Sequence, residues 1–178
     1  ERNLYQQVMD IYATSIDYKK DAKLTRQFFA TVQNKMHVAA HGKTAAELVY
    51  ERADAKKPNM GLTNFKGDYI TSDDVEVAKN YLSEEELSIL NLIVSQYLDF
   101  AELQATRQKA MTMQQWIDKL DEFLKVSDSS VLVGAGKIKH EQAMTRAKRE
   151  FKKYRDEEMR RMESDFDKAI KELRSKES

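Results

Sequence analysis

Cysteine is absent from the 178-residue chain, so disulfides, cysteine-based zinc sites and thiol nucleophiles are all excluded. Proline (one) and glycine (five) are scarce. Their scarcity argues against a sandwich or barrel of many short strands, because such folds need frequent turn residues. No apolar run approaches the roughly 20 residues of a membrane span, and no signal peptide opens the chain. These absences predict a helical, cytoplasmic protein without a membrane partner.

Neither sign of charge is in excess, because 30 Lys and Arg residues balance 30 Asp and Glu residues. A protein dedicated to binding the phosphate backbone of nucleic acid is normally basic, so the balance argues against that role for the whole chain. The first residue, Glu1, is followed directly by a helical pattern. We therefore expect the chain to be a piece of a longer protein.

Apolar residues recur at helical spacing along most of the chain, which predicts an all-α fold with a single helical domain of about seven helices. The 84–108 helix is the most apolar and is the expected core. We expect a helical core over 1–136 and one long C-terminal helix over 137–178 that partly projects. The predicted helices cover 2–16, 24–40, 45–53, 71–82, 84–108, a segment starting at 112, and 139–178.

Two capping boxes mark helix starts, in which Thr44 precedes Glu47 and Ser83 precedes Glu86 by three residues. Thr112 can cap a further helix. Gly42 stands where a helix would end in a left-handed residue.

The 55–71 segment is the longest irregular stretch, and a loop of that length is more often functional or disordered than a mere connection. We expect burial of its three apolar residues to order it against His41 and Glu47. Two interpretations remain, a lysine-bearing solvated loop or a site for an anionic ligand. The candidate ligand-binding residues are Asn59, Thr63, Asn64 and Lys66.

His37 and His41 are four residues apart and share a helix face, the spacing of metalloprotease helices. Val38 stands where such a helix has its glutamate, so the motif is broken. Glu47 could supply a carboxylate as third metal ligand. The favoured interpretation is a structural pair at a helix end, and a polar site without metal is a further alternative. We predict no bound metal and no cofactor. Should the chain be an enzyme, the candidate catalytic residues are His41, Glu47 and Arg52, and Arg52 has no glutamate one helical turn away.

Seven segments carry a family resemblance: 12–18 (YATSIDY), 29–37 (FATVQNKMH), 44–47 (TAAE), 57–67 (KPNMGLTNFKG), 78–82 (AKNYL), 97–102 (YLDFAE) and 111–116 (MTMQQW). Over residues 1–155 the chain resembles the RhuM family of bacterial proteins, which is called virulence-associated. The resemblance implies that relatives carry a preceding region similar to a phage-antirepressor DNA-binding module and often lie near defence genes. It implies no established activity. The His-Pro-Phe and Gly-Asn-Gly segment of Fic AMP-transferases is missing, so that activity is excluded for this chain.

The C-terminal helix predicts self-association. Its second half is mostly charged yet carries a stripe of Met159, Met162, Phe166, Ile170 and Leu173. Such a stripe either folds back or pairs with a second copy, and we expect an antiparallel homodimer in which basic 146–155 lies near acidic 156–167. The basic run could alternatively meet phosphates or simply be a solvated helix face.

Two functions thus remain open from the sequence. One is a C-terminal effector or protein-interaction module of a RhuM-like protein whose full-length form also contacts nucleic acid. The other is an enzyme acting on nucleic acid or nucleotide through His41, Glu47, Arg52 and the 55–71 loop. Convergence of those side chains in one pocket would favour the enzyme.

Overall fold

The structure is a computed structural model that describes residues 6, 10, 12–19 and 23–176. Over these residues it contains five α-helices, three short 3-10 helices and no strand, which confirms the predicted all-α class. The α-helices are α2 (Lys23–His41), α3 (Ala45–Arg52), α4 (Glu84–Thr106), α5 (Met113–Val126) and α6 (His140–Lys176). The 3-10 helices are η1 (Pro58–Gly61), η2 (Asp74–Glu76) and η3 (Ala78–Tyr81).

The prediction of seven helices is wrong, because the 71–82 segment forms the two 3-10 turns η2 and η3 in place of an α-helix. Side chains there bond to the backbone groups that an α-helix would use. The Asn80 amide donates to the Asp74 carbonyl at 2.9 Å, and the Tyr81 hydroxyl donates to the Val75 carbonyl at 2.8 Å. Such bonds compete with the helical ladder. The predicted 2–16 helix falls mostly outside the described residues.

Local start and stop signals, in contrast, are confirmed. The Thr44 amide donates to Glu47 at 2.8 Å and the Glu47 amide donates back to the Thr44 hydroxyl, so α3 begins with a full capping box. Reciprocal bonds of the same kind begin α4 at Ser83 and α5 at Thr112. Gly42, directly after α2, has a φ of 80° as the left-handed cap requires.

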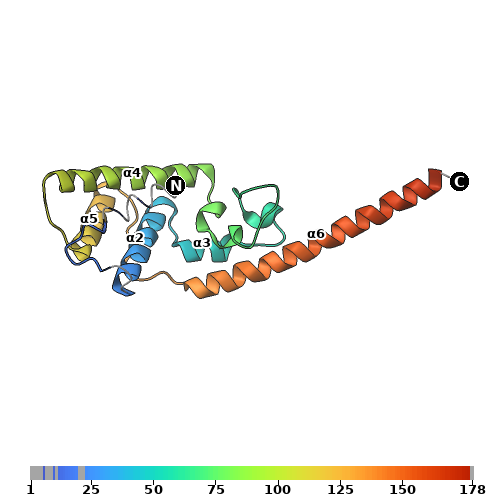
Figure 1. Ribbon diagram of the computed structural model, residues 1–178, viewed down its shortest axis with the longest axis horizontal. Coiled ribbons are helices and arrows are strands. Elements are labelled where there is room, and N and C mark those ends of the chain that lie inside the picture. The colour runs from blue at the N-terminus through green and yellow to red at the C-terminus, as the bar shows by residue number, and fades with distance from the viewer. Residues whose placement is uncertain (1–5, 7–9, 11, 20–22, 177–178) are drawn as a thin grey trace.

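The core lies among α2, α4 and α5, with α4 along the top of the body in Figure 1. Aromatic rings fill it, and the ring of Tyr12 lies edge-on to Phe28 with centroids 4.7 Å apart. The Tyr97 hydroxyl donates to the Trp116 carbonyl at 2.7 Å, which satisfies its buried oxygen. The buried ammonium of Lys35 on α2 contacts Asp121 of α5 at 2.8 Å and donates to the Leu132 carbonyl at 2.9 Å. This lysine therefore joins two helices to the segment that leads into α6.

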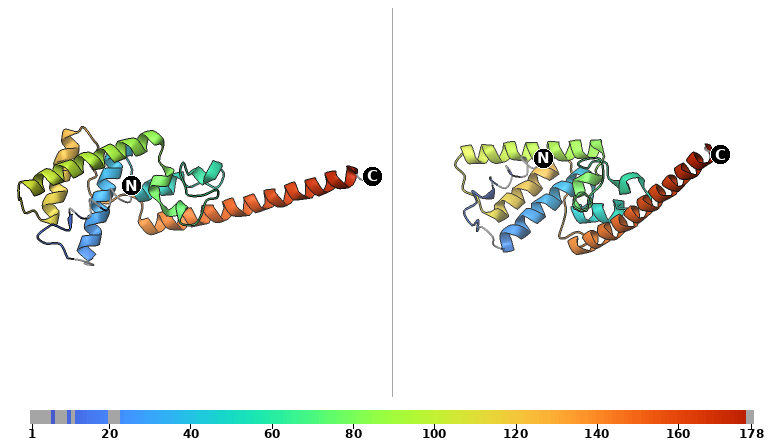
Figure 2. Two further views of the ribbon diagram at one scale, coloured as in Figure 1. Left: turned by 45° about the horizontal axis from the view of Figure 1, so that its top comes forward. Right: turned by 45° about the vertical axis from the view of Figure 1, so that its right-hand side comes forward.

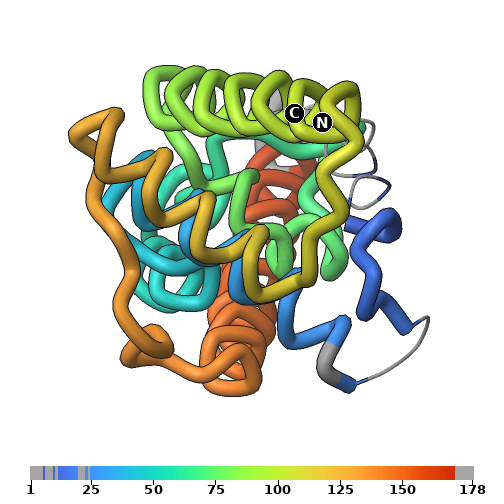
Figure 3. The backbone as a smooth tube through the Cα atoms, turned by 90° about the vertical axis from the view of Figure 1, so that its left-hand side faces the viewer, coloured from blue at the N-terminus to red at the C-terminus, as the bar shows by residue number. Residues whose placement is uncertain are grey.

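α6 packs only its first part against the body, on α3 and the short helices η1 and η2. Ala143 and Ala147 are fully buried, and their small side chains allow close approach. The buried Glu150 carboxylate accepts from the Ala55 amide at 3.3 Å and from Lys153 at 2.8 Å. Figures 1 and 2 show the second part of α6 extending away from the body, and Figure 3 shows the helix starting at the lower edge of the body and running behind it. A 37-residue helix measures about 55 Å at 1.5 Å per residue.

The 55–71 segment packs through Met60 and Leu62, which are buried, and through Phe65, which is partly buried. It follows the end of α3 and lies against that end. At Gly61 the backbone has a φ of 84°, and a Cβ there would stand 2.4 Å from the Arg52 carbonyl oxygen. The segment therefore needs glycine for its close approach to α3.

We expect Gly61→Ala to destabilise the protein more than Gly67→Ala. Gly67 has a similar φ of 79°, but a Cβ added there would have no neighbour within 4 Å. Its replacement should cost about 1–2 kcal/mol for the left-handed backbone alone. Gly61→Ala should cost about 1–3 kcal/mol more, because the added methyl overlaps backbone that cannot move aside. Urea unfolding of both variants measures the difference, and equal losses would contradict the close contact.

Candidate functional site

The two histidines predicted as a possible metal pair lie side by side on α2. His37 Nδ1 and His41 Nε2 are 2.9 Å apart, so one proton is shared in a hydrogen bond between them. Burial, and secondarily the charge of His41, lowers the pKa of His37 to about 4. His37 is therefore neutral at pH 7. Within the described part of the chain, no three His, Asp or Glu side chains group so that they could hold a metal ion.

Glu47 points to the segment before α6. One carboxylate oxygen accepts from the Thr44 amide, and the other accepts from the Lys137 amide at 2.7 Å. Burial opposes ionisation of this group, but the two amide donors outweigh it and lower the pKa of Glu47. Glu47 thus caps α3 and fixes the chain that enters α6.

Arg52 joins α3 to the start of α4. Its guanidinium contacts both carboxylate oxygens of Glu86, at 2.6 and 2.5 Å, and also donates to the Tyr81 carbonyl at 2.7 Å. Chiefly because of these bonds from Arg52, the pKa of Glu86 falls to about 2. The partner that Arg52 lacks in its own helix is therefore 34 residues along the chain.

The three candidate catalytic side chains consequently bond to different elements. His41 bonds to His37 on α2, Glu47 to the segment before α6, and Arg52 to α4 and its preceding turn. Burial is the main cause of the lowered pKa of His41. The nearby charge of Glu86 raises this pKa and that of Arg52 lowers it.

The loop candidates divide in the same way. Thr63 donates its hydroxyl to the Asn80 carbonyl at 3.0 Å and to the Leu82 carbonyl at 2.5 Å, so it holds the loop to the turn before α4. Asn59 is exposed and has a left-handed φ of 50° within η1. Asn64 and Lys66 have exposed side chains at the rim of a cavity.

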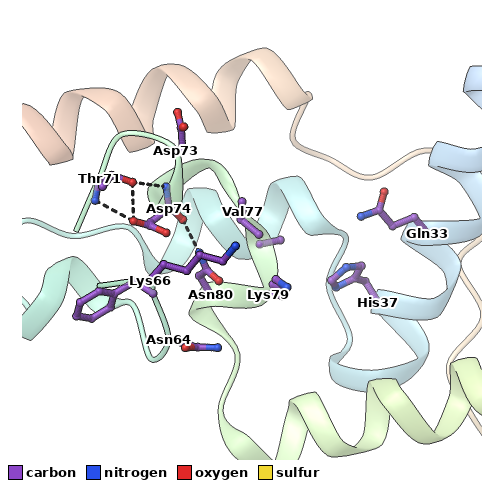
Figure 4. Close-up of a pocket in the computed structure, with 12 residues that line it drawn as sticks. Gln33, His37, Asn64, Lys66, Thr71, Asp73, Asp74, Val77, Lys79 and Asn80 are labelled. Carbon is purple, nitrogen blue, oxygen red and sulfur yellow. Dashed lines mark hydrogen bonds between the residues drawn. The ribbon is translucent and has the colours of Figure 1, made fainter. Parts of the chain in front are cut away.

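That cavity measures about 630 Å³ and is the place where sequence-predicted residues do come together. Figure 4 shows His37, from α2, at one end of it, with Asn64 and Lys66 at the other end. Asp74 accepts from the Thr71 amide and hydroxyl at 2.9 and 2.5 Å and is thereby engaged in the cavity wall. The remaining lining residues, which sequence reasoning missed, are Gln33, Phe65, Thr71, Asp73, Asp74, Val77, Ala78, Lys79 and Asn80.

A second candidate site is the apolar stripe on the outer part of α6. Met159, Met162 and Phe166 are 56, 61 and 67% exposed, and Ile170 is partly exposed. Leu173, the last residue predicted for the stripe, lies where side chains are not described. Large apolar side chains exposed together on one helix face are unusual in a monomeric soluble protein and indicate an interaction surface.

The model of the Virulence protein RhuM family matches residues 1–163, nearly the whole chain. The chain belongs to this family. No curated protein and no solved structure matches it. In this RhuM-family chain, the match covers the cavity and all three candidate catalytic residues and ends within α6. Over the described residues, no helix is both long and apolar enough to cross a membrane.

Replacing His37 should flatten the pH dependence of stability in mildly acidic solution. In the unfolded chain a histidine takes up its proton near pH 6.5, whereas in the folded chain the pKa of His37 is about 4. The unfolded state thus binds more protons over this window, and stability falls as the pH is lowered through it. We expect native protein to lose roughly 2–3 kcal/mol between pH 7 and 4 through this group. His37→Gln should lose much less, as measured by urea unfolding at pH 7, 5.5 and 4; an unchanged slope would refute the assignment.

The ion pair between Arg52 and Glu86 should contribute stability at neutral pH that disappears in stronger acid. The folded pKa of Glu86 is depressed, so its stabilisation is complete above about pH 4.5 and is lost as the pH falls towards 2. Glu86→Gln keeps an oxygen for the Ser83 amide but removes the charge. We expect this variant to be less stable than native protein at pH 7 and to converge with it near pH 2. Thermal unfolding followed by circular dichroism measures both, and a gap that persists at pH 2 would contradict the prediction.

Proposed function

We propose that this chain is the protein-interaction module of a RhuM-family protein and that the outer part of α6 is its binding surface. The observation that carries the proposal is the exposed stripe of Met159, Met162 and Phe166 on a helix that extends beyond the body. Full burial of a large apolar side chain is worth roughly 1.5–3 kcal/mol. Several such side chains on one helix face provide a driving force for binding another protein.

The position of the stripe on α6 explains why it stays exposed. The face of α6 that docks on the body is marked by Ala143, Ala147 and Glu150, which are all buried. At about 100° per residue, Phe166 is rotated from these three positions by roughly 100–160° around the helix. Met144 and Phe151 also pack against the core and lie only about 40° and 60° from Phe166 around the helix. The stripe stays exposed mainly because this part of α6 extends beyond the body (Figure 1). The stripe is therefore available to a partner.

The enzyme alternative receives less support from the geometry. It needs His41, Glu47 and Arg52 to converge on one reacting group, whereas each bonds to a separate element. The hydrogen bonds of Glu47 and Arg52 connect separate elements of the fold, so a structural role explains both side chains.

The family resemblance suggests what such a module would serve. In a longer protein with a DNA-binding-like N-terminal region, an interaction module would bring a protein partner, or another copy, to the DNA. The role in defence or virulence loci would then depend on assembly and not on catalysis by this part of the chain.

Site-specific photo-crosslinking in the natural bacterial host tests the proposal. A photoreactive phenylalanine analogue in place of Phe166 of the full-length protein should give a covalent protein adduct upon irradiation. The same analogue at Ser164, two residues away and so on the opposite side of the helix, is the matched control and should give none. No adduct at Phe166, or equal adducts at both positions, would contradict a binding surface on the stripe.

A further inference from the structure

We infer that the partner of the outer part of α6 is the α6 helix of a second copy of this chain, antiparallel and staggered, with the two-fold axis passing beside Met159. The inference rests on the proposed function and adds the identity and register of the partner. It is carried by how charge is distributed along one face of the helix.

Charge along α6 is divided into two adjoining segments of opposite sign. Residues 146–155 contain six basic side chains and one acidic side chain, whereas residues 156–167 contain six acidic and two basic ones. A helix with adjoining basic and acidic segments is complementary to itself only when its copy runs in the opposite direction. A parallel, in-register pair would place like charges side by side over both segments.

Three of the six basic side chains of residues 146–155 share one face with the apolar stripe. Lys148 precedes Phe166 by 18 residues, or about five full turns, and Lys152 and Arg155 lie within about 40° of the same line. On the docked part of α6 this face is only partly open: Thr145, Lys152 and Arg155 are exposed, whereas Lys148 contacts Glu76 of η2 and Met144, about 40° from the same line, packs against the core. The body covers the other side of the helix through Ala143 and Ala147. A second helix can therefore lie along this face from Lys152 outwards.

The charges on this face that lack an ion-pair partner are the ones that a staggered pair would bring together. Over the described residues, Lys152 and Arg155 make no ion pair, and neither do Glu163 and Asp167. Several neighbouring charges are already engaged, such as Lys148 with Glu76 at 2.9 Å. An unpaired basic group and an unpaired acidic group eight or more residues apart on one helix can meet only across two chains.

A single register satisfies these groups. When Met159 lies opposite its own copy, Arg155 lies opposite the partner's Glu163, and Lys152 lies beside the partner's Phe166 and the partner's Asp167. The aliphatic stem of Lys152 then covers the ring of the partner's Phe166, and the Lys152 ammonium is attracted to the face of that ring. Centring the pair on Phe166 would bury more apolar surface but would place Asp165 opposite the partner's Asp167. The staggered register avoids this repulsion.

The absence of cysteine allows a direct test of the register by single-cysteine crosslinking. Met159→Cys should form a disulfide-linked dimer under mild oxidation, because the two copies of residue 159 face each other. Phe166→Cys should not link to itself, because its two copies stand about 21 Å apart along the axis. A mixture of Phe166→Cys and Lys152→Cys chains should link into mixed dimers. Glu157→Cys, on the far side of the helix, is the control and should form no disulfide-linked dimer.

Charge reversal tests the attraction without relying on crosslinks. Arg155→Glu should raise the dissociation constant of the dimer at least tenfold in sedimentation equilibrium. Adding Glu163→Arg to the same chain should restore association, because the two charges exchange places across the interface. Dissociation should also increase at 1 M salt, since exposed ion pairs are screened there. Failure of the double variant to regain association would overturn the pairing of these two residues.

The outcomes also separate this inference from the proposed function. Linkage of Phe166→Cys to itself without linkage at Met159 would overturn the staggered register, and linkage at both positions would indicate a parallel pair. A chain that stays monomeric at high micromolar concentration, while Phe166 still gives a photo-adduct with another protein in the host, would refute the self-pairing and leave the binding surface intact. A monomeric chain that also gives no photo-adduct at Phe166 would refute both the self-pairing and the proposed binding surface.

Discussion

The docking of the first part of α6 on α3 determines where the remaining features lie. Two buried alanines permit the close approach, and the buried Glu150 carboxylate accepts the Ala55 amide that follows α3. The segment that enters α6 is also held in place. Glu47 accepts a hydrogen bond from the Lys137 amide, and Gly136 lies so close to Thr44 that a Cβ there would overlap the Thr44 side chain. With both contacts in place, the direction in which α6 leaves the body has little freedom. The direction in which the stripe and its neighbouring basic side chains extend from the body follows from that single packing arrangement.

The parts of the fold that could be predicted from the sequence are those determined within one helical turn. The capping boxes at Thr44 and Ser83 need only two residues three apart, so pattern and structure agree. The helix predicted for 71–82 failed because its polar side chains bond to backbone carbonyls within the same few residues, which a hydrophobic pattern does not register. The family was likewise identifiable from short segments, and the family model confirms it.

The candidate site depended on contacts between distant residues and was predicted less well. The sequence indicated that Arg52 had no partner one turn away, yet only the packing of α3 against the start of α4 identifies Glu86 as that partner. Asn64 and Lys66 were selected from a loop composition, and His37 from a helix spacing, but the fold alone places them around one cavity. Gln33 and Lys79 line the same cavity, and the sequence indicated neither of them as a site residue.

α6 is one continuous helix, but its two parts are stabilised differently. Up to Tyr154, which packs against the core, tertiary contacts hold its backbone, so its amides open only when the body loosens. Beyond that point the described contacts are pairs within the helix itself, such as Glu158 with Arg161 at 3.0 Å and Asp165 with Lys168 at 3.3 Å. Forming the first turn of an isolated helix is unfavourable, whereas adding residues to an existing helix is not. The outer half therefore depends on the docked half to nucleate it, and hydrogen exchange along α6 would fall into two regimes that meet where the apolar stripe begins.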